Sequence, residues 1–185
     1  LRRQRQMCIR DSFDSADTTT GGIVGINHGT LISCQFTGVV TGDSEVGGIV
    51  GRNESEGTID HSTARAIVTG KSSTGGIAGY NLGAITGCTN VGSINTEYPE
   101  ASLDTDGFTA KMVDYINNKM AAAADDATNS VTNVATDTGG IAGRSSGMIL
   151  TSVNTGTIGY EHVGYNVGGI VGRTDGLVSG CVNPV

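Results

Sequence analysis

The sequence of 185 residues has no tryptophan, three phenylalanines and five tyrosines, so bulky aromatic side chains are scarce. A compact globular domain of this length normally fills its core with larger side chains. Glycine, in contrast, accounts for 30 residues. This composition argues against a globular core and favours a narrow solenoid.

The sequence also lacks the patterns of several kinds of site. No run of about eighteen apolar residues is present, so we expect no membrane span. There is no Cys-x-x-Cys pair, no His-Glu-x-x-His, and no Lys-Ser or Lys-Thr after a Gly-x-x-Gly phrase, so we expect neither a metal nor a phosphate-binding loop. The net charge of −7 disfavours nucleic acid, whose binding depends on neutralising phosphates. We therefore expect no cofactor.

What the sequence does contain is one short phrase in five copies. Gly-Gly-Ile-Val-Gly begins at Gly21, Gly47 and Gly168, and Gly-Gly-Ile-Ala-Gly begins at Gly75 and Gly139. Successive copies are 26, 28, 64 and 29 residues apart, so one interval contains an insertion. A phrase at a fixed period is typical of a repeat architecture, in which each unit packs against its neighbours.

Aligning the copies reveals three apolar columns. Their members are Ile23, Ile49, Ile77, Ile141 and Ile170; Leu31, Ile59, Ile85, Ile149 and Val178; and Val40, Val68, Ile94 and Ile158. Short β-branched runs bounded by glycine indicate strands and not helices. Three strands in about 27 residues predict an all-β, three-sided parallel β-solenoid of about five coils, wound as a right-handed β-helix.

Two polar columns accompany the apolar ones. Asn27, Asn53 and Asn81 share a turn position that Ser145 and Thr174 occupy in the last two copies, and stacked amides can bond from coil to coil. Cys34, Cys88 and Cys181 share a second position with Ser62 and Ser152, which indicates packing at a tight corner. Cys34 and Cys88 are two coils apart, which is too far for a disulfide, so we predict three free thiols.

The pattern resembles the GLUG repeat, a glycine-rich motif of bacterial surface proteins. The resemblance is carried by Gly-Gly-Ile-Val-Gly-Ile-Asn-His-Gly-Thr-Leu-Ile-Ser-Cys-Gln-Phe-Thr-Gly-Val-Val-Thr-Gly over residues 21–42, and it extends over residues 21–94 and 139–185. The small-residue pair departs from the motif at Gly87-Cys88 and Thr151-Ser152. GLUG repeats occur in secreted or surface-attached proteins, including some immunoglobulin A1 peptidases, outside the peptidase domain. The resemblance therefore implies a stalk or adhesive module without catalysis.

These patterns divide the chain into four parts. Residues 13–94 are expected to form coils one to three, and residues 139–185 coils four and five, the last one truncated. Residues 95–138 form an insert, in which apolar residues at helical spacing predict an amphipathic helix over about 109–127. Asp104-Thr105-Asp106-Gly107 resembles part of a calcium loop but is better explained as a turn into the helix.

The insert helix would carry Met112, Tyr115, Ile116 and Met120. These residues are expected either to pack on the flank of the solenoid or to form a partner-binding face. The partner would be an unknown surface ligand, a host or bacterial glycan or protein. The other contacts would be with neighbouring coils of the parent chain.

Residues 1–12 share nothing with the repeat and resemble the translation of a sequencing-library adapter, so they are expected to be non-native. The alternative is a basic arm that binds nucleic acid or a membrane. The segment has four arginines and one aspartate, a contribution of +3, so without it the net charge would be −10.

The leading hypothesis is a non-catalytic structural and adhesive module of an exported bacterial protein, located at the cell surface or outside the cell. A glycan-active β-helix enzyme and the non-catalytic region of a secreted peptidase are the alternatives. For the enzyme, Asp60 and Asp175 are candidate acids, with His61 and Arg65 near Asp60. Adjacent strand residues face opposite sides, so Asp60 and His61 are not expected to act together.

Overall fold

The computed structural model describes residues 14–15, 19–96, 135–159 and 164–184. This part of the chain consists of short strands joined by tight turns and contains no helix. All strand pairs are parallel, as the repeat predicts. The helix expected over about 109–127 lies outside the described residues.

The strands form four sheets, which the chain visits in the order B, C, D, A on every coil. Sheet B contains β2 (Thr20–Gly21), β6 (Ser44–Gly47), β10 (Ser72–Gly75), β15 (Ala135–Gly139) and β20 (Gly164–Gly168). Sheet C contains β3 (Val24–Asn27), β7 (Val50–Asn53), β11 (Ala78–Asn81), β16 (Ala142–Ser145) and β21 (Val171–Thr174). Sheet D contains β4 (Thr30–Ile32), β8 (Thr58–Asp60), β12 (Ala84–Thr86), β17 (Met148–Leu150) and β22 (Leu177–Ser179). Sheet A contains β1 (Asp14–Ser15), β5 (Gln35–Gly42), β9 (Thr63–Thr69), β13 (Thr89–Asn90), β14 (Ser93–Ile94), β18 (Val153–Asn154) and β19 (Thr157–Ile158).

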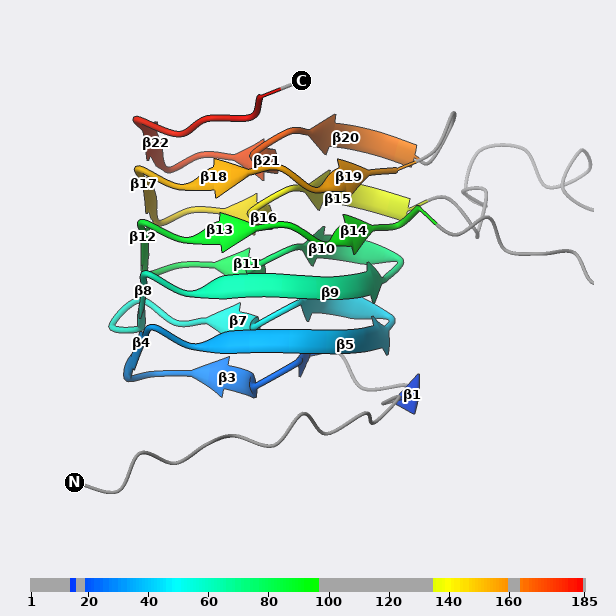
Figure 1. Cartoon of the computed structure of the whole chain (residues 1–185), viewed down its shortest axis with the longest axis horizontal. Helices are drawn as coiled ribbons and strands as arrows, with labels where there is room; N and C mark the ends of the chain where they lie inside the picture. The colour runs from blue at the N-terminus through cyan, green and yellow to red at the C-terminus, as the bar shows by residue number, and fades with distance from the viewer. Residues whose placement is uncertain (1–13, 16–18, 97–134, 160–163, 185) are drawn as a thin grey trace, which may run out of the picture.

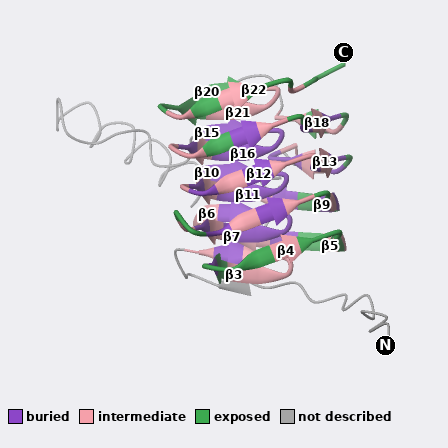
Figure 2. Ribbon diagram, turned by 90° about the vertical axis from the view of Figure 1, so that its left-hand side faces the viewer, coloured by how far each residue is buried: buried purple, intermediate pink, exposed green. Residues whose placement is uncertain are grey.

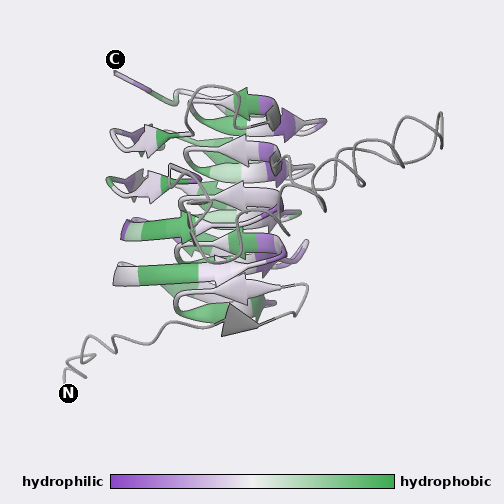
Figure 3. Cartoon of the chain, turned by 90° about the vertical axis from the view of Figure 1, so that its right-hand side faces the viewer, coloured by the Kyte–Doolittle hydropathy of each residue, from purple (hydrophilic) through white to green (hydrophobic). Residues whose placement is uncertain are grey.

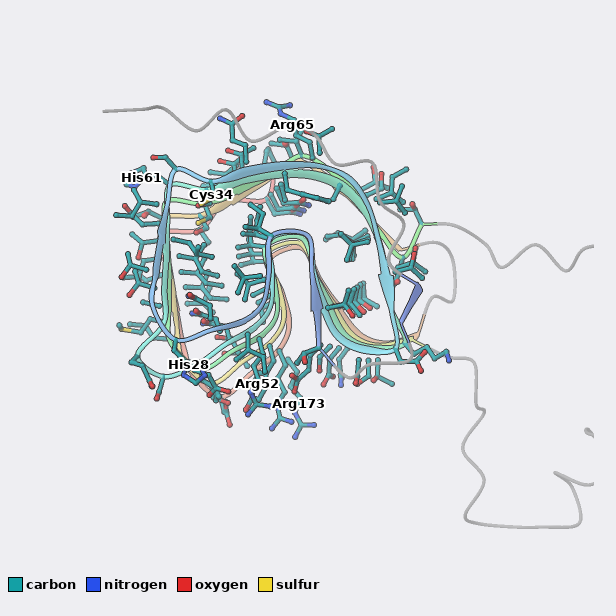
Figure 4. All side chains as sticks on the ribbon, turned by 90° about the horizontal axis from the view of Figure 1, so that it is seen from below. His28, Cys34, Arg52, His61, Arg65 and Arg173 are labelled. Atoms are coloured by element: carbon teal, nitrogen blue, oxygen red, sulfur yellow. The ribbon has the colours of Figure 1, made fainter. Side chains whose placement is uncertain are left out.

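The coils stack into a β-solenoid with four complete turns (Figure 1). A fifth turn passes through β20, β21 and β22 and continues to Val182, which bridges to Val153. Seen from the N-terminal end, the chain runs clockwise as it recedes, which is the right-handed winding expected (Figure 4). Since β15 begins at Ala135, residues 135–138 already belong to the fourth coil.

Each complete coil passes through four sheets and not the three sides that the apolar columns indicate. The additional segment is sheet B, in which β6 buries a single large apolar side chain, that of Val46. The strand β10 of the next coil has the sequence Ser-Ser-Thr-Gly and buries Thr74 at the matching position. Strands so poor in apolar residues give no signal in a hydrophobic pattern.

Sheets B and C are the two sides of an arch that folds into the solenoid, with the repeated phrase at its bend (Figure 4). The two sides touch through their backbones. A Cβ atom on Gly47 would lie 1.9 Å from the carbonyl oxygen of Val50, and one on Gly79 would lie 2.2 Å from the carbonyl carbon of Glu45. Neither glycine has a positive φ, so the phrase needs glycine for the missing side chain and not for backbone freedom.

The tip of the arch reaches sheet A and divides the interior. A Cβ atom on the second glycine of the phrase would meet a side chain of sheet A, that of Phe36 for Gly22 and that of Asn90 for Gly76. The larger apolar cluster lies on the side of sheets C and D and contains Ile49, Ile59, Ile77, Ile85, Ile141 and Ile149. The smaller cluster lies between sheets A and B and contains Val40, Val46, Ala66, Val68 and Ile94.

Burial is greatest in the middle coils and decreases toward both ends (Figure 2). Ile77 and Ile141 are fully buried, whereas Ile23 and Ile170, in the same column, are half-buried. Hydrophobic and hydrophilic residues recur at matching positions from coil to coil (Figure 3). Each coil thus depends on its neighbours for burial, as in other repeat proteins.

The asparagine column forms a continuous ladder of buried amides. The Nδ2 atom of Asn27 donates to Oδ1 of Asn53 at 2.8 Å, and Asn53 donates to Asn81 at 2.8 Å. Asn81 then donates to the hydroxyl of Ser145 at 3.1 Å. The predicted coil-to-coil bonding is confirmed, although none of these asparagines has a positive φ.

The arch predicts that a methyl group is tolerated at one end of the solenoid and not in its middle. In Gly79→Ala the new Cβ atom meets the backbone of Glu45 and Val46, so we expect a loss of about 3 kcal/mol in the free energy of unfolding. Gly25→Ala changes the same position of the first coil, where the nearest atom is 3.6 Å away, and should be almost neutral. Urea denaturation compares the two, and equal stability of both variants would contradict the arch contact.

The ladder predicts that losing an asparagine destabilises the protein more in the middle of the solenoid than at its end. Asn53→Ala removes bonds to Asn27 and Asn81 and leaves buried amide groups unpaired, so we expect a loss of about 2–4 kcal/mol. Asn27→Ala removes a bond to only one neighbouring coil and should cost roughly half as much. Thermal melts would disprove the ladder if Asn27→Ala were the more damaging change.

Candidate functional site

The outer face of sheet C carries the most distinctive group of charged and aromatic side chains. The residue before the ladder position points outward in every coil, and the cross-coil partners are Ile26, Arg52, Tyr80, Arg144 and Arg173. We call these five residues the arginine column. Arg52 and Arg173 project from the same side of the solenoid, opposite Arg65 (Figure 4).

Tyr80 holds the arginines on either side of it. The Cζ atom of Arg52 lies 5.1 Å from the centroid of the Tyr80 ring, and that of Arg144 lies 5.2 Å from it. The phenolic hydroxyl is 3.2 Å from the hydroxyl of Ser146. A guanidinium group within about 6 Å of a ring centroid is attracted by the ring quadrupole, so Tyr80 restricts both arginines.

At the N-terminal (lower) end of the arginine column, carboxylates neutralise the charge of Arg52. Arg52 forms ion pairs with Glu45 at 2.9 Å and with Glu54 at 2.8 Å. Partial burial raises the pKa of Glu45, although the charge and hydrogen bond of Arg52 oppose this shift. Arg52 is therefore committed to carboxylates of its own chain.

The C-terminal (upper) end of the column, formed by Arg144 and Arg173, is more exposed to solvent. Arg144 is half-exposed and Arg173 is exposed, and Asp175 lies near both of them. The hydrogen bond from Ser146, a backbone hydrogen bond and the two arginines lower the pKa of Asp175. Asp137 of β15 is buried and accepts a 2.7 Å hydrogen bond from Asn166. Among the described residues, the C-terminal end of the column therefore presents two guanidinium groups beside one exposed carboxylate.

The structure corrects the expectation for Asp60 and His61. The Nδ1 atom of His61 lies 2.8 Å from Oδ1 of Asp60, so the prediction that the two side chains face opposite sides is wrong. The alternation of a strand ends at Asp60, because His61 has a φ of 44° and begins the turn to sheet A. Ser33, Gly87, Thr151 and Gly180 have positive φ at the same corner. The pair lies on an exposed corner of the solenoid (Figure 4).

The cysteine and serine side chains that share one column pack at a tight corner, as their small size predicts. The members of this cysteine column are Cys34, Ser62, Cys88, Ser152 and Cys181. The backbone N–H of Cys34 donates to the Ser62 hydroxyl at 3.1 Å, and that of Cys88 donates to the Ser152 hydroxyl at 3.2 Å. The three described thiols, those of Cys34, Cys88 and Cys181, are free, which confirms the prediction for them. Burial raises the pKa of Cys88 to about 11.

The predicted partner-binding residues Met112, Tyr115, Ile116 and Met120 lie outside the described residues. Within the described ranges, no three histidine, cysteine or acidic side chains are grouped so that they could hold a metal ion. No helix there has the length and apolar character needed to cross a bilayer.

Two features of the site could have been found in the sequence. The arginine column lies five residues after the first glycine of each phrase, but its first member is an isoleucine and its third a tyrosine. A second ladder joins the buried Asn90 and Asn154 at 2.8 Å and continues from Asn154 to the exposed Asn183 at 2.7 Å. Phe36 and Ala64 occupy this column in the first two coils, so the sequence does not show a repeated asparagine at this position.

A cavity of about 320 Å³ opens at the last coil. It is lined by Gly156, Ile158, Val167, Gly168, Gly169, Asn183 and Pro184. None of these lining side chains is charged or nucleophilic. The cavity lies between sheets A and B, where the interior of the last coil is open.

Parallel strands that stack in register over successive coils define the class of this protein as a β-solenoid repeat protein. Within this class, the family model of the GLUG motif matches residues 42–69, which run from the end of β5 to the end of β9 and complete one coil. The match confirms the resemblance that the repeated phrase carries. No curated protein and no solved structure matches the chain.

The free thiols should differ in reactivity. In a Cys8→Ser variant at pH 8, iodoacetamide should label the half-exposed Cys34 and Cys181, while Cys88 stays unlabelled until the protein is unfolded, since its thiolate is scarce and buried. Mass spectrometry of the peptides measures this. Equal labelling of all three in the native protein would contradict the packing of the corner.

Proposed function

We propose that this chain is a structural and adhesive repeat module of an exported bacterial surface protein, and that it acts without catalysis. Its place is at the cell surface or outside the cell, and its partner is a host or bacterial glycan or protein. The GLUG motif at residues 42–69 supports this proposal, because the motif resembles repeats of surface proteins.

The observation that carries the proposal is that the interior side chains hold the coils together, whereas the exterior side chains remain available for binding. The polar side chains inside the coils bond to neighbouring coils, as Asn53 and Asn154 do. The outer faces present columns of side chains that do not take part in the ladders. Their residue types can therefore differ from coil to coil, as they do in the arginine column. Repeat proteins commonly use such extended outer surfaces for binding.

One observation favours the second candidate, a glycan-active β-helix enzyme. Asp60 and His61 are in contact, and a carboxylate beside a histidine is a common acid–base arrangement. Their side chains are 31% and 68% exposed, respectively, and the pair lies at an outer corner of the solenoid, away from the cavity at the last coil (Figure 4). Enzyme sites are usually concave, so we rank this candidate second.

The test applies the full chain to an array of polysaccharides and extracellular-matrix proteins and measures both retention and the release of reducing sugar. We expect retention on at least one surface with no sugar released above a buffer control. Asp60→Asn is the matched variant, because it removes the charge of the pair while keeping its size. Sugar release that Asp60→Asn abolishes would replace the proposal with the enzyme, and no retention on any surface would refute adhesion.

A further inference from the structure

The upper end of the arginine column places two like charges next to each other. Arg144 and Arg173 are direct partners in neighbouring strands of sheet C, one coil apart, which is a separation of about 4.8 Å between their backbones. Like charges directly opposite in a sheet are destabilising. In contrast to Arg52, neither arginine forms an ion pair with the described carboxylates.

The neighbouring residues compensate this repulsion only in part. Tyr80 attracts Arg144 through the face of its ring, and Asp175 influences both arginines from an exposed position. Ser146 and both arginines lower the pKa of Asp175, but no ion pair joins Asp175 to either guanidinium group within the described part of the chain. Arg144 is half-exposed and Arg173 is exposed, so this pair of residues is accessible from solvent.

We propose that Arg144 and Arg173 form a binding site for the carboxylate or sulfate groups of an acidic polysaccharide. Planar guanidinium donors match the paired oxygens of such groups, and bidentate contacts give both energy and geometric specificity. Tyr80 preorganises Arg144, which lowers the conformational entropy that binding must overcome. The inference rests on the adhesive function proposed above, because it names the ligand class of that function.

The surrounding charges limit what the site can bind. The chain as a whole has a net charge of −7, so a polyanion is repelled at long range and held only by local contact. Duplex nucleic acid needs many phosphate contacts over a broad basic surface. A chain with spaced anionic groups needs only two adjacent arginines, which the structure provides. An acidic polysaccharide is therefore the better fit.

The experiment measures the binding of the full chain to immobilised heparin, to polygalacturonate and to neutral dextran, with duplex DNA as a further probe. Heparin presents sulfate groups and polygalacturonate presents carboxylates, so the two arms distinguish the two anions. Arg144→Gln and Arg173→Gln should each raise the Kd about tenfold for the anionic polysaccharide that binds. Arg65→Gln is the matched control, because it removes the same charge from an exposed site on the opposite side and should leave the Kd unchanged.

A second variant keeps the test independent of folding. Asp175→Asn removes the exposed carboxylate that the described residues place beside the pair and should tighten binding a few-fold, which a folding defect would not do. Equal weakening by Arg65→Gln, or equal binding of duplex DNA, would overturn the site. Binding to dextran or to a matrix protein alone would overturn it while leaving adhesion intact, and no binding to any surface would refute both proposals.

Discussion

The fold depends on a contact between two backbones that only glycine permits. Sheets B and C approach so closely across the arch that a Cβ atom on Gly47 or Gly79 would lie within about 2 Å of main-chain atoms. The contact brings the bend of the arch against sheet A, which creates two narrow apolar compartments in place of one wide interior. Valine, isoleucine and alanine suffice to fill compartments of this width, which explains how a chain without tryptophan buries a continuous core.

Polar ladders complement this packing. Burying an amide without a partner is costly, but each asparagine of the ladders finds its partner one coil away. The cysteine column also joins neighbouring coils, because its Ser62, Cys88 and Ser152 side chains each accept a hydrogen bond from a backbone N–H of the preceding coil. The same side chains therefore fill the interior and fix the register between coils.

The sequence predicts the solenoid, its period and its first ladder, because each of these repeats a side chain of one kind at a fixed distance from the phrase. Sheet B is missed because its strands, such as Ser72–Gly75, pack through backbone atoms that leave no hydrophobic pattern. The contact of Asp60 with His61 is missed because the positive φ of His61 ends the alternation of the strand. The arginine column is present in the sequence but mixes residue types, so it is recognised only when the coils are superposed.

The ladders also have a direction. Asn27, Asn53, Asn90 and Asn154 each donate through Nδ2 to the coil that follows in the chain, and none donates to an asparagine of the coil before. Each coil therefore presents amide donors to the coil that follows it and amide acceptors to the coil that precedes it. The two ends of the ladders are therefore chemically different: toward the C-terminus they offer donors to a further coil, and toward the N-terminus they offer acceptors.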